Sequence, residues 1–313
     1  MPTAPSRQNP FRLGTRRSPL ALAQAEEAWQ RLCAAHGWAP DAVELVPVTA
    51  SGDRIQDRAL AEIGGKALWT RELDLYLAQG RIDAAVHSLK DVETIRPDEI
   101  AIAAVLPRAD PADVLLGALS IQALPRGATV GTSAPRRAAQ LLNLRPDCRV
   151  VLFRGNVATR LAKLAAGEVA ATFLAAAGLD RLGEGGVGTR LDPEAWLPAP
   201  SQGAIGIECR AGDAGARNWL AAIDHPVSRA EVTAERALLA ALGGSCHSAV
   251  ACLSRWEGEL LQLSAAVFSP DGAERIAGEA RFDAGDPAGP CLLAEELLAH
   301  APESVRATFQ PPA

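Results

Sequence analysis

The feature that most constrains the fold is an alternation of short apolar segments with amphipathic ones over the first two thirds of the chain. Ser18 and Pro19 match the N-cap and first turn of a helix that runs to about Ala35, with Gly37 near its end. Further helices are predicted at about 67–79 and after Ser133, Asn156 and Ala176, and strands at 43–48, 83–89, 114–119, 128–132, 149–153 and 169–174. Strands that alternate with helices form mostly parallel sheets, with the site in loops at the strands' carboxyl ends. The segment 202–208 predicts a strand without a local partner, and we expect it to return to the first sheet.

The last part of the chain has a different pattern. A helix at about 229–242 ends at the turn GGSC (243–246), and two or three strands follow at 248–255, 259–269 and 274–282. Turns at Glu257-Gly258 and Asp271-Gly272 suit hairpins, and a helix at 291–300 closes the pattern. The sequence predicts three domains: an α/β domain at 10–105 and 203–224, a second α/β domain at 106–202, and a small C-terminal α+β domain at 225–313.

The composition narrows the class of protein. The 313 residues carry a formal net charge of −6, yet many arginines gather in particular motifs. This balance favours a local anion site over a surface that coats nucleic acid. No apolar run reaches membrane-spanning length, and the N-terminal segment lacks the apolar core of a signal peptide, so we expect a cytoplasmic protein. The six cysteines are scattered without a CxxC pair, which predicts neither a zinc site nor a disulfide framework.

Seven arginines lie in short Gly-, Ser- or Thr-rich motifs at expected strand-to-helix junctions. They are Arg16, Arg17, Arg136, Arg137, Arg154, Arg160 and Arg181. Such a junction aims backbone N–H groups and the positive end of a helix dipole at one point, and arginine adds a planar fork matched to carboxylates and phosphates. A single arginine is more often a solvated surface residue. Four such motifs favour a shared site for a ligand with many negative groups, and adjacent arginines repel each other unless an anion neutralises them.

Two other motifs are candidates for chemistry. Lys90 and Asp91 follow an apolar strand, where a carboxylate can steady a developing cation; the alternative is a surface ion pair. Cys246 follows two glycines in a turn and is expected to be accessible, as a nucleophile or a covalent attachment point; the alternative is a structural thiol. His87 and Tyr76 are interpreted as structural, and GGKAL (64–68) lacks the full phosphate-loop pattern.

Together these segments resemble the porphobilinogen deaminase family, also called hydroxymethylbilane synthases. The matching segments, in the family's order and covering about residues 12–250, are RLGTRRSPLALAQ, IGGKALWTRELD, DAAVHSLKDVE, VGTSAPRRAAQL, RGNVATRLAKL, LAAAGLDRLG, APSQGAIGIECR and TAERALLAALGGSC. The chain after residue 255 matches only in pattern. The resemblance implies two α/β domains of the periplasmic-binding-protein type around a cleft, and a third domain whose cysteine, here Cys246, carries a dipyrromethane cofactor through a thioether.

The family condenses four porphobilinogen molecules into the linear tetrapyrrole hydroxymethylbilane in haem biosynthesis, with release of ammonia at each step. The resemblance implies that Asp91 is the catalytic carboxylate and that no metal takes part. It implies cofactor binding by Ser18, Lys90, Arg136, Arg137, Arg154 and Arg160, and substrate binding by Arg16, Arg181, Gln202 and Lys66. We expect a monomer whose partner is porphobilinogen, and no nucleic acid or membrane. The alternative is a non-catalytic or poorly active paralogue that binds a polyanionic pyrrole-type ligand; a mere binder needs neither Cys246 nor Asp91.

Some residues depart from the family pattern near the predicted site. Glu62 stands where many members have lysine, and Trp69 where they have phenylalanine. Ala134-Pro135 replaces Ser-Leu before the arginine pair, and Pro200-Ser201 replaces Val-Gly. Ser245, His247 and Ala249 also surround the predicted cofactor cysteine in an unusual way.

Overall fold

The computed structural model describes residues 4–49 and 69–309. Within these ranges, residues 4–49, 69–109 and 204–229 form one compact unit, and residues 110–203 and 230–309 form the other. The mixed α/β class is confirmed: each unit has a five-stranded sheet, and the second unit also has a small three-stranded one. The three predicted domain boundaries stay predictions, since the second and third predicted domains fall in one compact unit.

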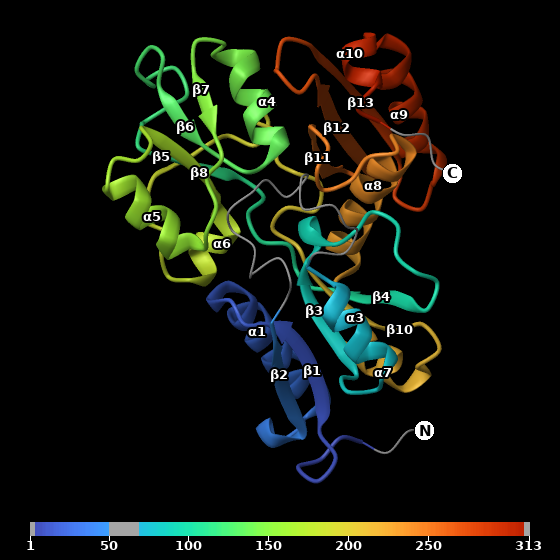
Figure 1. Cartoon of the computed structure of the whole chain (residues 1–313). Helices are drawn as coiled ribbons and strands as arrows, with labels where there is room; N and C mark the ends of the chain where they lie inside the picture. Colours follow the sequence, from blue (N-terminus) through green and yellow to red (C-terminus); the bar gives the residue numbers. More distant parts are fainter. Residues whose placement is uncertain (1–3, 50–68, 310–313) are drawn as a thin grey trace. The chain divides into compact units, whose positions relative to one another are not determined.

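The sheet of the first unit has the strand order β2-β1-β3-β10-β4. Its strands are β1 (Phe11–Arg16), β2 (Val43–Val48), β3 (Ala84–Ser88), β4 (Ile100–Val105) and β10 (Ile205–Arg210). The strand β1, which lies between β2 and β3, is parallel to both, whereas β10 is antiparallel to β3 and β4. In Figure 1 the late strand β10 runs between β3 and β4. The predicted return of segment 202–208 to the first sheet is therefore confirmed, in an antiparallel direction.

Helices cover both faces of this sheet. They are α1 (Pro19–His36), α3 (Arg71–Ala78) and α7 (Ala214–Ala221), with short 3-10 turns η1 (Pro40–Ala42) and η3 (Leu89–Asp91). Ala84 and Val86 pack with residues of α1 and α7, whereas Ala85 packs with Leu73 and Leu77 of α3. Successive side chains of a strand point to opposite faces, so α3 lies on the face opposite α1 and α7. As predicted, Ser18 caps α1 and Gly37 ends it in a left-handed conformation.

The five-stranded sheet of the second unit repeats the topology of the first. Its order is β7-β6-β8-β5-β9, from β5 (Asp113–Leu116), β6 (Thr129–Gly131), β7 (Arg149–Val151), β8 (Ala171–Ala175) and β9 (Thr189–Arg190). The strand β6, which lies between β7 and β8, is parallel to both, and β5 is antiparallel to β8 and β9. The helices α4 (Pro135–Leu144), α5 (Val157–Ala165) and α6 (Ala176–Arg181) each follow a parallel strand. Both sheets thus place strand-to-helix junctions at the carboxyl ends of their parallel strands.

The third sheet is the predicted antiparallel one. It consists of β11 (Val250–Glu257), β12 (Leu260–Phe268) and β13 (Arg275–Asp283), and it follows α8 (Pro226–Ala241) and precedes α9 (Ala288–His300) and α10 (Glu303–Arg306). Leu263 packs against Leu238 of α8 and Leu293 of α9. Alternate residues of β11 and β12 pack instead with Ala139 of α4 and with Leu197, which joins this sheet to the rest of its unit.

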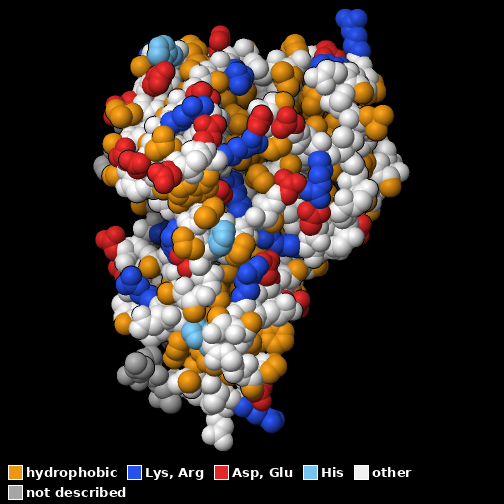
Figure 2. All heavy atoms as spheres, turned by 180° about the vertical axis from the view of Figure 1, so that it is seen from behind, with side chains coloured by type: hydrophobic (Ala, Val, Ile, Leu, Met, Phe, Trp, Pro, Cys, Tyr) orange, Lys and Arg blue, Asp and Glu red, His pale blue; other side chains and the backbone are white. Residues whose placement is uncertain are grey.

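The surface carries both signs of charge. On the face in Figure 2, blue Lys and Arg side chains alternate with red Asp and Glu side chains. Within the described ranges, no helix combines the length and the apolar character needed to cross a membrane.

Candidate active site

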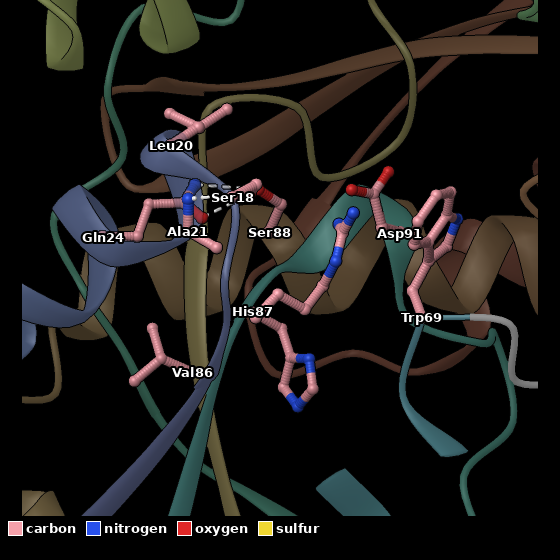
Figure 3. A pocket seen from close by; sticks show the side chains of 10 residues that line it. Ser18, Leu20, Ala21, Gln24, Trp69, Val86, His87, Ser88 and Asp91 are labelled. Carbon is pink, nitrogen blue, oxygen red and sulfur yellow. Dashed lines mark hydrogen bonds between the residues drawn. The ribbon is translucent and has the colours of Figure 1, made fainter. Parts of the chain in front are cut away.

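A pocket opens where β1 and β3 of the first unit end. Figure 3 shows the side chains around it, which belong to Arg16, Ser18, Leu20, Ala21, Gln24, Trp69, Val86, His87, Ser88 and Asp91. The strand β1 ends at Arg16, α1 begins after the Ser18 cap, and β3 ends at Ser88. The pocket therefore lies at the strand-to-helix junction that the sequence predicted, with three predicted site residues: Arg16, Ser18 and Asp91.

Polar contacts fix one wall of this pocket. The Ser18 side chain accepts a hydrogen bond from the backbone N–H of Ala21 at 3.3 Å and so caps α1. The Gln24 amide, one turn further along α1, donates to Ser88 Oγ at 2.7 Å. This bond ties the helix to the end of β3. The pattern-based prediction missed Gln24 and Ser88, although Ser88 lies inside the HSLKD motif that drew attention to Asp91.

A cation–π contact forms another part of the pocket. The guanidinium carbon of Arg16 lies 4.0 Å from the centre of the Trp69 ring. Such stacking holds an arginine side chain in place without neutralising its charge. The departure from phenylalanine at position 69 thus gives Arg16 the aromatic partner that binds cations best.

The backbone holds Asp91 at the pocket. Asp91 ends the turn η3, whose first residue, Leu89, is buried and donates its N–H to the Ala204 carbonyl at 3.1 Å. A Cβ at Gly206 would lie 2.3 Å from a Leu89 methyl carbon, so any larger residue at this position of β10 would displace the Leu89 side chain. Lys90 is half-buried in the same turn. In Figure 3 the His87 ring points away from Ser18 and Asp91, which agrees with its interpretation as a structural residue.

The adjacent arginines of the second unit have a counter-charge within the chain. Arg136 and Arg137 lie in the first turn of α4 and are buried. Arg136 donates to one oxygen of Asp113 at 2.5 Å and Arg137 to the other at 2.7 Å. Burial alone would raise the pKa of the Asp113 carboxyl, but the two guanidinium charges outweigh it and hold that pKa well below its usual range.

Two neutral donors complete this buried cluster. The Trp196 indole N–H and the Gln202 amide each donate to Asp113 at 2.8 Å. Two arginines and one aspartate leave a net charge of +1, so the repulsion between adjacent arginines does not by itself require a ligand. The sequence analysis did not single out Asp113, because its arginine partners lie 23 and 24 residues further along the chain.

Three further arginines of the motifs lie in or next to the helices α5 and α6, and Arg181 lies at the end of its helix away from the strand. Arg154 is buried between β7 and α5, whose N-cap Asn156 accepts from the Thr159 N–H at 2.8 Å. Arg160 in α5 donates to the Gly155 carbonyl at 3.0 Å. Arg181 is the last residue of α6 and donates to the Gly203 carbonyl at 3.3 Å. The contacts of these three side chains with a ligand stay predictions.

Cys246 is accessible. All six cysteines lie within the described residues, none of them is in a disulfide, and Cys246 alone among them is exposed. It sits in a turn closed by Ser245 and Ser248, where the Ser245 N–H donates to Ser248 Oγ at 3.0 Å. Burial raises the pKa of the thiols of Cys33, Cys148 and Cys209. Cys246 therefore fits covalent attachment of a cofactor better than the buried thiols do.

Two residues named from the sequence lie outside the described part of the chain. They are Lys66, predicted to bind substrate, and Glu62, the departure from the family's lysine.

The fold and the pocket define an α/β protein with an arginine-bearing site at the carboxyl ends of its strands. Two family models match the chain: "Porphobilinogen deaminase, dipyromethane cofactor binding domain" over residues 11–218, and "Porphobilinogen deaminase, C-terminal domain" over residues 229–299. The chain belongs to the porphobilinogen deaminase family, and the resemblance predicted from its sequence is confirmed.

Curated relatives agree over nearly the whole length. The chain is 59% identical over 308 residues to the porphobilinogen deaminase of Sphingopyxis alaskensis, covering 96% of this chain and 97% of the relative. It is 50% identical over 306 residues to that of Paracoccus denitrificans, covering 96% and 98%.

Solved structures match less closely. A BvgS VFT2 domain of Bordetella pertussis gives a TM-score of 0.40 at 17% identity, covering 68% of this chain and 84% of that one. A periplasmic binding protein of Salmonella typhimurium with high arginine specificity gives 0.37 at 12%, covering 68% and 90%.

Proposed function

We propose that this protein is a hydroxymethylbilane synthase, which condenses four porphobilinogen molecules into the linear tetrapyrrole hydroxymethylbilane and releases one ammonia per step. Membership of the porphobilinogen deaminase family over nearly the full length supports this activity. The observation that carries the proposal in the structure is the placement of Asp91 in a pocket that also contains the guanidinium of Arg16. Porphobilinogen is an acidic pyrrole, so a cation suits its carboxylates and an anion suits the positive charge that forms as it reacts.

The proposed role of Asp91 follows from the reaction. The bond between the aminomethyl carbon and nitrogen breaks, ammonia leaves with the electron pair, and a positive charge spreads over the pyrrole ring. A carboxylate beside the pyrrole N–H stabilises that charge. A new carbon–carbon bond then joins this carbon to the free ring carbon of the growing chain, and that ring carbon loses a proton to a base. Asp91 is proposed both to stabilise the cation and to accept this proton.

Residues of both units are proposed to hold the cofactor and the substrate. When bound through a thioether to Cys246, a dipyrromethane supplies the acidic pyrrole chain that is extended. In the first unit, Ser18 and Lys90 are proposed to bind its acid groups and Arg16 those of the substrate. In the second unit the proposed binding residues are Arg136, Arg137, Arg154, Arg160, Arg181 and Gln202. Asp113 neutralises one of the two charges of Arg136 and Arg137, so a net charge of +1 remains to attract the acid groups of the ligand.

We also propose a monomer that works in the cytoplasm and does not bind nucleic acid. Six cysteines without a disulfide among them, all within the described residues, suit a reducing compartment. The net charge of −6 and the mixed charges on the face in Figure 2 do not suit a polyanionic nucleic acid. Sedimentation equilibrium measures the mass in solution, and a dimer would contradict the first of these proposals.

The activity is tested by turnover of porphobilinogen, followed with an aldehyde reagent for pyrroles, in the wild type and in Asp91→Asn. This substitution keeps the shape and removes the charge, so turnover should fall by about 10²–10⁴-fold. Asp98→Asn, at an exposed residue in the same unit, is the control and should keep normal turnover. Near-normal turnover in a folded Asp91→Asn would refute the role of Asp91. A wild type that binds porphobilinogen without turning it over would favour the alternative, a non-catalytic paralogue.

A further inference from the structure

A buried ion cluster lies beside the pocket, with Arg96 at its centre. Arg96 is five residues after Asp91, and its side chain is 9% exposed. Its Nε and one terminal nitrogen donate to the two oxygens of Glu208 at 2.8 and 3.0 Å. The terminal nitrogens also donate to Asp74 at 2.5 Å and to Glu93 at 2.6 Å. One guanidinium therefore binds three carboxylates that come from three segments of the chain.

The pair of Arg96 and Glu208 at the centre of this cluster is shielded from water. Glu208 has no exposed surface, and His87 Nε2 lies 3.2 Å from its second oxygen. Burial opposes the charge of Glu208, but His87 and Arg96 outweigh it and lower the pKa of this carboxyl to about 2. Removal of one member from such a cluster leaves an uncompensated buried charge, so the segments it joins are held firmly.

The cluster joins two parts of the pocket wall. Glu93, two residues after Asp91, accepts the Thr70 hydroxyl at 3.0 and 2.9 Å. Thr70 directly follows Trp69, whose ring lies against the Arg16 guanidinium. The remaining contacts of Arg96 reach Asp74 in α3 and Glu208 in β10, which are secured in the core of the first unit. The segment that ends in Asp91 and the segment that begins at Trp69 are thus fastened to one buried guanidinium.

We infer that Arg96 is a positioning residue for the reaction: it sets the placement of Asp91 and Trp69 without lining the pocket itself. The inference rests on the proposed function only in that Asp91 is the group that acts. A carboxylate that stabilises a cation must lie within hydrogen-bond reach of the pyrrole N–H, and a shift of about 1 Å costs on the order of 100-fold in rate. No motif marks Arg96 in the sequence, because its partners lie up to 112 residues away.

Arg210 offers a matched control in the same unit. It is partly buried, donates to the Leu77 and Ile82 carbonyls at 2.9 and 2.8 Å and pairs with Asp213 at 2.6 Å. Like Arg96 it joins β10 to the region of α3, but neither it nor its partners line the pocket. Arg210→Leu should therefore cost stability without disturbing Asp91.

The test compares Arg96→Leu, Arg96→Lys and Arg210→Leu in the full chain by two measurements. Hydrogen exchange read by mass spectrometry should show at least about tenfold faster exchange for peptides that contain residues 69–71 and 89–93 in Arg96→Leu, and wild-type exchange there in Arg210→Leu. In porphobilinogen turnover, Arg96→Leu should lower kcat by about 10–100-fold with a smaller change in KM. Arg96→Lys should recover part of kcat, because it restores the charge but not the fork that binds both oxygens of Glu208.

The outcomes separate the inference from the proposed function. Unchanged exchange at 89–93 in Arg96→Leu overturns the inference, whether or not the wild type is active. An equal loss of kcat in Arg210→Leu also overturns it, since general destabilisation would then account for both variants. A wild type without turnover refutes the proposed function and leaves the exchange test in force. If Arg96→Leu does not fold, Glu93→Gln is used in its place. This substitution removes only the carboxylate charge that binds Thr70 and Arg96, and it should give the same local increase in exchange.

Discussion

The backbone at Ser201 gives a prediction about stability. Among the described residues, Ser201 alone combines a side chain with a φ in the left-handed region, at 63°. It is 1% exposed, and its N–H donates to the buried Glu235 at 2.6 Å. The family pattern that the sequence resembles is expected to have glycine at this position. Serine thus holds a conformation that glycine adopts without steric cost, in a loop that a buried carboxylate fixes.

The magnitude follows from two opposing terms. A residue with a Cβ in the left-handed region costs roughly 1–2 kcal/mol. Glycine relieves this cost but gains freedom in the unfolded chain, which offsets about 0.4–1 kcal/mol. The buried Ser201 Oγ has no hydrogen-bond partner among the described residues. Its removal therefore costs little free energy of unfolding. Ser201→Gly should therefore raise the free energy of unfolding by about 1 kcal/mol, or the melting temperature by about 2 °C.

Urea unfolding and calorimetry of three variants test this reasoning. Ser201→Ala removes the hydroxyl and keeps the strained backbone, so Ser201→Gly should be the more stable of the two. Ser254→Ala removes another buried hydroxyl without a described partner, from the regular strand β11, and controls for the loss of a hydroxyl alone. If Ser201→Gly is no more stable than Ser201→Ala, backbone strain at this position is refuted.

Three further predictions follow from the buried charges. Asp113→Asn removes the counter-charge of Arg136 and Arg137 and should lower the unfolding free energy of the second unit by about 3–5 kcal/mol in urea; a loss below about 1 kcal/mol would contradict the pairing. Because the pKa of Glu208 falls from 4.5 to about 2 on folding, its contribution of about 3 kcal/mol is complete above pH 4.5 and is lost as the pH falls toward 2. Glu208→Gln should flatten this part of the acid stability curve, and an unchanged curve would argue against the lowered pKa. Arg154→Leu should weaken binding of the acidic cofactor during its assembly by about 1.5–3 kcal/mol, measured as the fraction of protein that acquires the covalent adduct, with partial rescue by Arg154→Lys; a full complement of adduct in the leucine variant would place Arg154 outside the site.

Local signals predicted most of the elements. The Ser18–Pro19 start and Gly37 end of α1 need only neighbouring residues, and so do the two hairpins at Gly258 and Gly272. The strands β4 and β9 and the helices α7 and α10 were missed, and β1 was implied only by the strand-to-helix junction expected at Arg16. β9 has only two residues, too few for a periodic pattern. The antiparallel direction of β10 is set by where the chain returns to the sheet, which no local pattern records.

The site was predicted only where its residues lie in motifs. Arg16, Ser18 and Asp91 stand in matching segments, and the structure brings them into one pocket. The buried counter-charges were not predicted, because each acts across the fold. Asp113 pairs with arginines 23 and 24 residues away, and Glu208 pairs with Arg96 at a distance of 112 residues along the chain. The pattern of charged residues in the sequence predicts whether a site is positive or negative. The buried residues that offset this charge can be identified only once the pairing of the strands is known.

The intact mass of the protein, before and after porphobilinogen is added, tests the central claim most directly. The account predicts a wild-type mass that exceeds the sequence mass by one dipyrromethane and rises by equal increments, each one porphobilinogen less ammonia. Cys246→Ser should fold and show the bare sequence mass with no increments. A Cys246→Ser protein that still carries the adduct, or a wild type that turns over porphobilinogen at its bare mass, would contradict the account.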